Sequence, residues 1–239
     1  MNTIQMKISD RQAIYTADEK NILDELLRLE GTTVLELGCG KAEKTRLVAK
    51  RAEMVLALEV DERQLTKNRK ITDLPNVTFD HGGAEEISSD DESFDIALMF
   101  KSLHHVPIEQ MDDAFLEIHR VLKPGGTLYI SEPVYDGALN EIIKIFNDEK
   151  RVREAAFDAE QRAVLSNKFT LETQKFFLQP VHFDSFTQFE EQSINVTYAN
   201  RTLSPEKHEE VRLKFEKHMT SDGADFLMPI RVDVLIKKG

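Results

Sequence analysis

Short apolar runs alternate with segments of helical periodicity along the first 133 residues of the chain. The runs are rich in β-branched residues and are bounded by turn residues, which is typical of buried strands. They lie at residues 33–37, 54–60, 76–80, 94–100 and 127–133. Helical spacing of apolar residues fills 18–31 and 107–122. Strands that alternate with helices predict a parallel sheet covered by helices on both faces.

The alternation changes after Glu132. Residues 138–165 contain no predicted strand and are expected to form two helices broken near 147–150. A strand at 175–183, a helix at 204–219 with Ser204 as N-cap and Pro205 in its first position, and a last strand at 228–238 follow. We therefore expect one domain of 239 residues, built from an N-terminal helical segment (1–30), a ligand-binding core (31–133), a helical insertion or lid (134–174) and C-terminal strands and helices (175–239).

The composition narrows the class of protein. Apolar residues make up 41% and charged residues 31% of the chain, which is the balance of a soluble globular protein. The net charge of −12 disfavours nucleic acid and anionic membranes as partners and favours a small substrate. Cys39 is the single cysteine, and no secretory or membrane-spanning run is evident, so the expected location is cytoplasmic. The oligomeric state cannot be predicted.

The stretch VLELGCGKAEKT, residues 34–45, leaves the first predicted strand through two glycines, Gly38 and Gly40. In a doubly wound sheet the loop after this strand faces the ligand, and glycine lets the backbone approach it closely. Glu59 ends the second strand, about twenty residues further on, where a carboxylate binds the hydroxyls of a ribose. These features together predict a nucleoside ligand.

The acidic residues around the loop distinguish between two candidate ligands, a dinucleotide and S-adenosylmethionine. A dinucleotide fingerprint requires a third glycine where Glu43 stands, and Glu36 lies two residues before the first glycine. Carboxylates at this turn repel a pyrophosphate, which argues against a nicotinamide-dependent oxidoreductase. They favour S-adenosylmethionine, which carries a ribose, an ammonium and a sulfonium but no phosphate.

Several ordered motifs resemble the class I S-adenosylmethionine-dependent methyltransferase family: LELGCG, ALEVD, DESFDIALMFKSLHHV and VLKPGGTLYI. The resemblance implies an α/β fold with a doubly wound, mostly parallel seven-stranded sheet, in the Rossmann-like order 3-2-1-4-5-7-6 with the last strand antiparallel. It implies that Glu36 binds the ammonium of the cofactor, Glu59 the ribose and Val60 the adenine. The backbone of Gly38, Cys39 and Gly40 would face the methionine part.

The chain departs from the family at two positions. The family usually has Asp where Gly83 stands and often Gly where Ala42 stands. We expect the backbone of Ala84 and the carboxylate of Glu85 to replace the missing contact to the adenine. Tyr15, which can lie over a sulfonium, and Phe100, at the end of the fourth strand, complete the predicted cofactor site, and no metal is expected.

Methyl transfer is an in-line displacement that needs alignment, exclusion of water and, for a hydroxyl or protonated amine, a base. His105, His104 and Glu132 are the candidate bases, in that order. The sequence FKSL replaces the Asn-Pro-Pro-Tyr of enzymes that methylate planar nitrogens. We therefore predict a methyltransferase that acts on an oxygen, nitrogen or carbon of a small molecule, with the insertion as a roof over the acceptor. A protein or tRNA substrate, or a non-catalytic cofactor-binding module, is the alternative.

Overall fold

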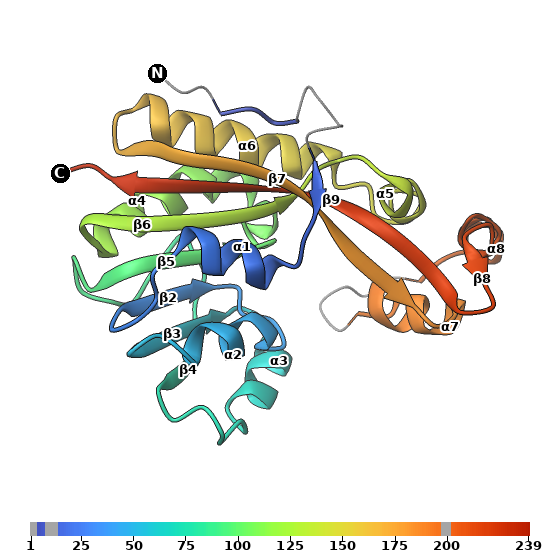
Figure 1. Ribbon diagram of the computed structural model, residues 1–239, viewed down its shortest axis with the longest axis horizontal. Coiled ribbons are helices and arrows are strands. Elements are labelled where there is room, and N and C mark those ends of the chain that lie inside the picture. Colours follow the sequence, from blue (N-terminus) through green and yellow to red (C-terminus); the bar gives the residue numbers. More distant parts are fainter. Residues whose placement is uncertain (1–3, 8–13, 197–201) are drawn as a thin grey trace.

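The computed structural model describes residues 4–7, 14–196 and 202–239. In these residues a single nine-stranded sheet runs in the order β1-β7-β9-β6-β5-β2-β3-β4, and β8 pairs with β9 (Figure 1). The strands are β1 (Tyr15–Thr16), β2 (Thr33–Leu37), β3 (Met54–Glu59), β4 (Val77–His81), β5 (Phe94–Phe100), β6 (Leu122–Pro133), β7 (Phe169–Phe183), β8 (Met219–Thr220) and β9 (Gly223–Lys237).

The seven longer strands follow the predicted order, with β9 antiparallel to both β6 and β7. The predicted fold class is confirmed. The two-residue strands β1 and β8 were not predicted, because two residues carry no periodicity. Strand β6 begins at Leu122 rather than at 127, because Leu122 pairs with Phe94 before the register shifts at the turn that contains Gly125 (φ +73°).

Helices cover both faces of the sheet. They are α1 (Glu19–Leu26), α2 (Glu43–Ala49), α3 (Glu62–Asn68), α4 (Met111–Val121), α5 (Ala138–Ile143), α6 (Lys150–Leu165), α7 (Phe186–Phe189) and α8 (Pro205–Glu216), with short turns η2 (Leu103–His105), η3 (Ile108–Gln110) and η4 (Glu190–Ile194). Alternate strand residues separate two cores: Leu35 packs with α4 and α6, and Val34 packs with α1 and α2. The helix α8 begins as predicted, since Ser204 Oγ accepts from the backbone N–H of Lys207.

A third core lies at one end of the molecule, where β7 and β9 extend as a twisted ribbon beyond the rest of the sheet (Figure 1). Phe183, Phe189, Phe215 and Phe226 pack there edge to face or at a tilt. The predicted apolar face of α5, with Leu139 and Ile142 buried, covers this aromatic core. The first half of the insertion therefore packs against the C-terminal elements.

The second half of the insertion packs into the main core. Ala156, Phe157, Ala159 and Ala163 of α6 are buried in the main core together with α4 and the sheet. Buried Arg231 of β9 fixes the helix, because its guanidinium binds Glu160 of α6 at 2.7 Å and Asp233 at 2.5 Å. The two predicted helices are present, and periodicity shows that one face of each is buried, not which core buries it; the role of residues 138–165 as a roof over the acceptor stays a prediction.

The ion pairs of Arg231 give a test of this packing. Arg231→Leu leaves two buried carboxylates without their cation, so we expect a loss of about 3–5 kcal/mol in the free energy of unfolding, measured by urea denaturation. The matched control is Arg162→Leu, which removes an exposed pair between α6 and Asp112 and is expected to cost less than about 1 kcal/mol. Equal losses in the two variants would show that Arg231 does not hold α6 in place.

Candidate functional site

The carboxyl ends of the parallel strands β2 to β6 meet at one edge of the sheet, and the predicted site residues other than Tyr15 lie along it. The loop after β2 is tied to β3, since the N–H groups of Gly38 and Cys39 both donate to Leu58 O at 3.0 Å. Gly38 has φ +78°, and a Cβ there would lie 2.8 Å from Ser102 Cβ. A Cβ on Gly40 (φ +51°) would meet nothing within 4 Å, so the loop backbone faces open space.

Asn68, the last residue of α3, supports this loop and was missed by the sequence analysis. Its side-chain amide is buried and donates to Gly40 O at 2.8 Å and to Cys39 Sγ at 3.4 Å. Burial raises the pKa of the Cys39 thiol, and Glu36 and Glu59 raise it further, so the thiol stays protonated. Ala42, fully buried with φ +62°, holds the turn at the position where the family often has glycine. Positive φ favours glycine, and the methyl group of Ala42 is the smallest side chain that can replace it in this buried turn.

Glu59 and Val60 lie beside the loop at the end of β3. Both oxygens of the largely buried Glu59 carboxylate accept from backbone N–H groups, one from Gly40 at 2.8 Å and one from Asp61 at 2.9 Å. These bonds leave lone pairs on each oxygen for further donors. Val60 is 59% exposed, so an apolar surface lies next to a fixed carboxylate. That combination suits the hydroxyls and the base of a nucleoside.

Glu36 lies beneath the loop at the end of β2. The side chain is 1% exposed, and its Oε2 accepts no hydrogen bond from the described part of the chain. Burial raises the pKa of its carboxyl to about 8; the Thr45 hydroxyl and the charge of Lys44 lower this pKa, whereas Glu59 raises it. A buried acceptor without a donor is costly, so this oxygen is poised for a cationic donor from a ligand.

At Gly83, where the family usually has Asp, a neighbouring side chain occupies the space beside the backbone. A Cβ built on Gly83 would overlap the carboxylate of Glu85, so this carboxylate lies where the side chain of residue 83 would begin. Ala84, between them, is buried. Since these residues follow β4, which pairs with β3, the Glu85 carboxylate lies one strand beyond Glu59 along the same edge.

The two histidines after β5 have different environments. His104 is buried and its Nδ1 lies 2.5 Å from Glu132 Oε2, whereas Glu132 Oε1 accepts from the backbone N–H of Leu103 at 3.0 Å. Burial opposes charge on both groups, but their contact raises the pKa of His104 and lowers the pKa of Glu132. Desolvation by the surrounding protein, followed by the charge of His104, lowers the pKa of His105 to about 4, although His105 keeps an exposed surface. Its imidazole is therefore neutral at pH 7.

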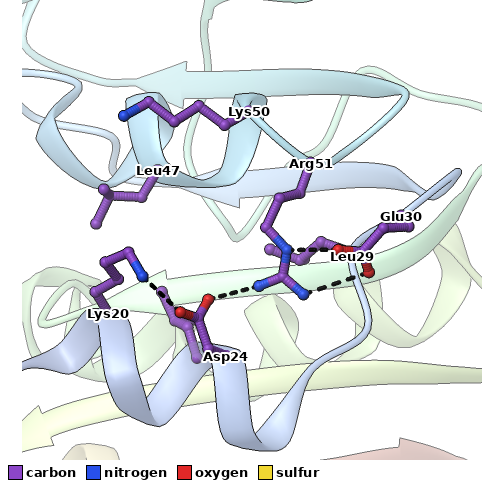
Figure 2. A pocket seen from close by; sticks show the side chains of 8 residues that line it. Lys20, Asp24, Leu29, Glu30, Leu47, Lys50 and Arg51 are labelled. Carbon is purple, nitrogen blue, oxygen red and sulfur yellow. Dashed lines mark hydrogen bonds and ion pairs between the residues drawn. The ribbon is translucent and has the colours of Figure 1, made fainter.

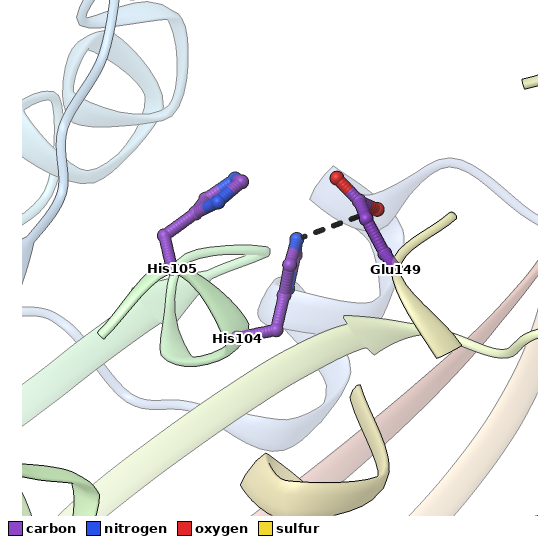
Figure 3. A group of neighbouring side chains, drawn as sticks. All are labelled: His104, His105 and Glu149. Atoms are coloured by element: carbon purple, nitrogen blue, oxygen red, sulfur yellow. Dashed lines mark ion pairs between the residues drawn. The ribbon is translucent and has the colours of Figure 1, made fainter. Parts of the chain in front are cut away.

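Glu149, which precedes α6, reaches the same place. One ligand atom each of His104, His105 and Glu149 lie within 4.8 Å of one another (Figure 3). Both oxygens of Glu149 already accept hydrogen bonds, from Asn147 at 2.6 Å and from Arg153 at 2.7 Å. Because the Arg153 guanidinium repels a cation and both Glu149 oxygens already accept hydrogen bonds, we interpret the group as a charge network, in which Glu149 Oε2 lies 3.9 Å from His104 Nε2.

The remaining predicted residues lie around these groups. The ring of Phe100, at the end of β5, packs against Tyr129 with centroids 5.6 Å apart. Tyr15 is 45% exposed and pairs with Phe177 on β7, at the far edge of the sheet order.

A surface groove of about 320 Å³ lies between α1 and α2, on the opposite edge of the sheet (Figure 2). Arg51 spans it and binds Asp24 at 2.6 Å and Glu30 at 2.7 Å. Arg51 and Glu30 precede β3 and β2, at the amino ends of these strands. In this groove Lys20 and Arg51 are paired with Asp24 and Glu30, and the groove lies away from the strand ends that carry the candidate site.

The raised pKa of Glu36 predicts how stability depends on pH. The folded state holds this proton more tightly than the unfolded chain does, so its stabilising effect is complete below pH 4.5 and is lost as the pH rises through about 8. Between pH 5 and 8.5 we expect wild type to lose on the order of 4 kcal/mol that Glu36→Gln does not lose. Urea denaturation at both pH values measures this, with exposed Glu53→Gln as the control. Parallel pH profiles for wild type and Glu36→Gln would contradict a buried, protonated Glu36.

Comparisons with known proteins agree with this geometry. Residues 35–130 match the family model of a methyltransferase domain. An uncharacterized methyltransferase-like protein of Schizosaccharomyces pombe is 35% identical over 136 residues, which cover 56% of this chain and 51% of that protein. A demethylmenaquinone methyltransferase of Listeria welshimeri is 36% identical over 111 residues, covering 44% and 46% of the two chains. The chain thus spans about half the length of these relatives.

A solved structure extends the likeness in fold to nearly the whole chain. YcgJ from Bacillus subtilis superimposes with a TM-score of 0.64 at 16% identity and covers 92% of this chain and 98% of its own. The site described above fits S-adenosylmethionine: the unpaired oxygen of Glu36 is an acceptor for an ammonium, the carboxylate of Glu59 is an acceptor for ribose hydroxyls, and both groups repel a phosphate. Residues 35–130 therefore match a methyltransferase domain whose site suits S-adenosylmethionine as cofactor, and over this region the chain is similar in sequence to methyltransferases.

Proposed function

We propose that the protein transfers the methyl group of S-adenosylmethionine to an oxygen, nitrogen or carbon nucleophile of a small molecule by in-line displacement. The cofactor supplies an electrophilic methyl group on sulfur. The observation that carries the proposal is His105: a neutral imidazole with an exposed surface at the strand edge, 4.1 Å between ring centroids from the buried His104. A neutral imidazole beside the cofactor loop is the proton acceptor that a hydroxyl or ammonium acceptor requires.

The contacts of the other two candidates favour His105 as the base. Glu132 is buried, and both its oxygens are engaged with Leu103 N–H and His104. His104 is buried, and its Nδ1 is already engaged with Glu132 Oε2 at 2.5 Å, so it is less accessible to an acceptor molecule than His105. We assign Glu132 and His104 the role of a rigid support that fixes η2, and thereby His105, at the end of β5.

The proposed cofactor contacts lie along the same edge of the sheet, at the carboxyl ends of β2 to β5. Glu36 binds the ammonium, Glu59 the ribose hydroxyls and Val60 the adenine ring. The backbone of Gly38, Cys39 and Gly40 follows the methionine part, with Phe100 near its sulfonium. Tyr15 lies on the edge strand β1, and its contact with the sulfonium stays a prediction. The backbone of Ala84 and the carboxylate of Glu85 face the adenine amino group, since Glu85 occupies the space in which the family's Asp would lie.

A small-molecule acceptor is supported by charge and by a relative. The net charge of −12 opposes a polyanionic substrate such as tRNA, and the relative from Listeria welshimeri is named for a small quinone substrate. Incubation with S-adenosylmethionine labelled in its methyl group, together with a panel of small phenols, quinols and amines, total tRNA and a protein extract, tests the class. Label is expected in the small-molecule fraction. Label confined to tRNA or protein, or bound cofactor without any transfer, would contradict the proposal.

The role of His105 predicts a selective loss of rate. We expect His105→Ala to lower the rate of methyl transfer by about 10²–10⁴-fold on the acceptor found in that screen, because proton removal loses its positioned base. The dissociation constant of S-adenosylhomocysteine, measured by calorimetry, should change less than about threefold, since His105 makes no proposed cofactor contact. His182→Ala, on the distant end of β7, is the control. An unchanged rate in His105→Ala would remove His105 from the reaction.

A side chain at position 83 and the Glu85 carboxylate would occupy the same space, so a double substitution at these positions is predicted to restore cofactor affinity. Glu85→Ala should weaken S-adenosylhomocysteine binding about tenfold through the lost hydrogen bond to the adenine amino group. Gly83→Asp alone forces two carboxylates into one place and should also weaken binding. The double variant Gly83→Asp with Glu85→Ala restores one carboxylate, so its affinity should return to within about threefold of wild type. Additive losses in the double variant would show that Glu85 does not take the place of the family's Asp.

A further inference from the structure

We propose that Lys101 and Lys44, whose ammonium groups meet on the buried carboxylate of Glu19, bind the α-carboxylate of S-adenosylmethionine. The contacts assigned above account for the ammonium, the ribose and the adenine of the cofactor. They leave its carboxylate without a partner. This inference rests on the cofactor of the proposed function and does not depend on the identity of the methyl acceptor.

The geometry gathers three charged side chains from separate elements. Glu19 is the first residue of α1 and is fully buried. Its Oε2 lies 3.2 Å from Lys101 Nζ and 3.6 Å from Lys44 Nζ. Lys101 Nζ also donates to Gln179 Oε1 of β7 at 2.8 Å, which fixes the ammonium in place. The other oxygen of Glu19 is buried and accepts no hydrogen bond within the described residues.

The charges of this cluster do not balance. Two ammonium groups share one carboxylate, so one positive charge is left over. The side chains of Lys101 and Lys44 are 26% and 24% exposed, whereas that of Glu19 is 0% exposed, so the cations lie between the carboxylate and the solvent. A partly desolvated excess cation is stabilised by an anion from a ligand more than it would be at an open surface.

The position of the cluster matches the methionine end of the cofactor. Lys101 directly follows β5, and Lys44 is the second residue of α2, so the two lysines flank the loop of Gly38 and Gly40. The charge of Lys44 lowers the pKa of Glu36, which places this lysine close to the carboxyl that binds the ammonium. An amino acid carries its ammonium and carboxylate on one carbon atom. Neighbouring acidic and basic groups are therefore the arrangement that its zwitterion requires.

A purely structural role for the same ion pairs makes a different prediction. If Lys101 only ties the sheet to α1, its removal disturbs every ligand of the site equally. If it binds the cofactor carboxylate, its removal disturbs only ligands that carry this group. Decarboxylated S-adenosylmethionine lacks the carboxylate and keeps the ammonium, sulfonium, ribose and adenine, so it separates the two roles.

The experiment measures, by calorimetry, the dissociation constants of S-adenosylmethionine and of its decarboxylated analogue. Wild type should prefer S-adenosylmethionine at least about tenfold, the value expected for one charge-assisted hydrogen bond. Lys101→Met should weaken S-adenosylmethionine about tenfold or more and the analogue less than about threefold, and Lys44→Met should act in the same direction. The control is Lys20→Met, which removes an exposed lysine next to Glu19 that pairs with Asp24.

Glu19→Gln is the second arm of the test. It keeps both lysines and removes their internal partner, so S-adenosylmethionine should bind at least as tightly as in wild type. Circular dichroism establishes that each variant is folded, and Lys101→Arg, which keeps the charge, replaces Lys101→Met if that variant unfolds; it should retain the preference for the carboxylate. Equal losses for both ligands, unchanged affinity in both lysine variants, or a selective loss in Glu19→Gln would each overturn the proposal.

Discussion

The cost of keeping carboxylates away from water shapes the functional edge of this sheet. The desolvation of Glu36 is the clearest case. Its carboxylate is buried under the loop after β2, and one of its oxygens has no hydrogen-bond donor in the described chain. Because burial disfavours the charged form, the pKa of Glu36 rises to about 8 and the carboxyl holds a proton at neutral pH. In the proposed function this unfavourable burial has a use, because an ammonium of the ligand restores the hydrogen bonds that the carboxylate lost on leaving water.

The neighbouring carboxylates show what a satisfied group looks like. Glu132 is as buried as Glu36, but His104 and the Leu103 N–H occupy its two oxygens. Glu59 lies between these extremes, since backbone N–H groups hold it and leave lone pairs free. At this edge the satisfied carboxylate of Glu132 holds the frame in place, and those of Glu36 and Glu59 keep acceptor capacity for a ligand. This distinction separates support from binding among residues of the same type.

The pattern of apolar residues predicted the strands well and the long-range contacts poorly. Strand β5 has the predicted bounds, because a continuous apolar run between polar turns admits one interpretation. The glycine loop and its acidic neighbours were also evident, since their roles depend on residues close in sequence. Asn68 and Glu19 were missed, because each acts on residues more than twenty positions away and lies in a helix whose spacing indicates only packing. Burial of α6 in the main core was missed for the same reason.

The family match ends at residue 130, yet the site does not. Glu132, Glu149 and Gln179 lie beyond this limit and contact His104, Arg153 and Lys101. In the proposed function the loop after β2 binds a cofactor common to many enzymes, so elements outside it have to distinguish one acceptor from another. Here these elements are the start of α6 and the strand β7, and both are fixed by core packing and buried ion pairs rather than by mobile loops. An acceptor therefore meets a preorganised surface, in which alignment with the methyl group is built into the fold.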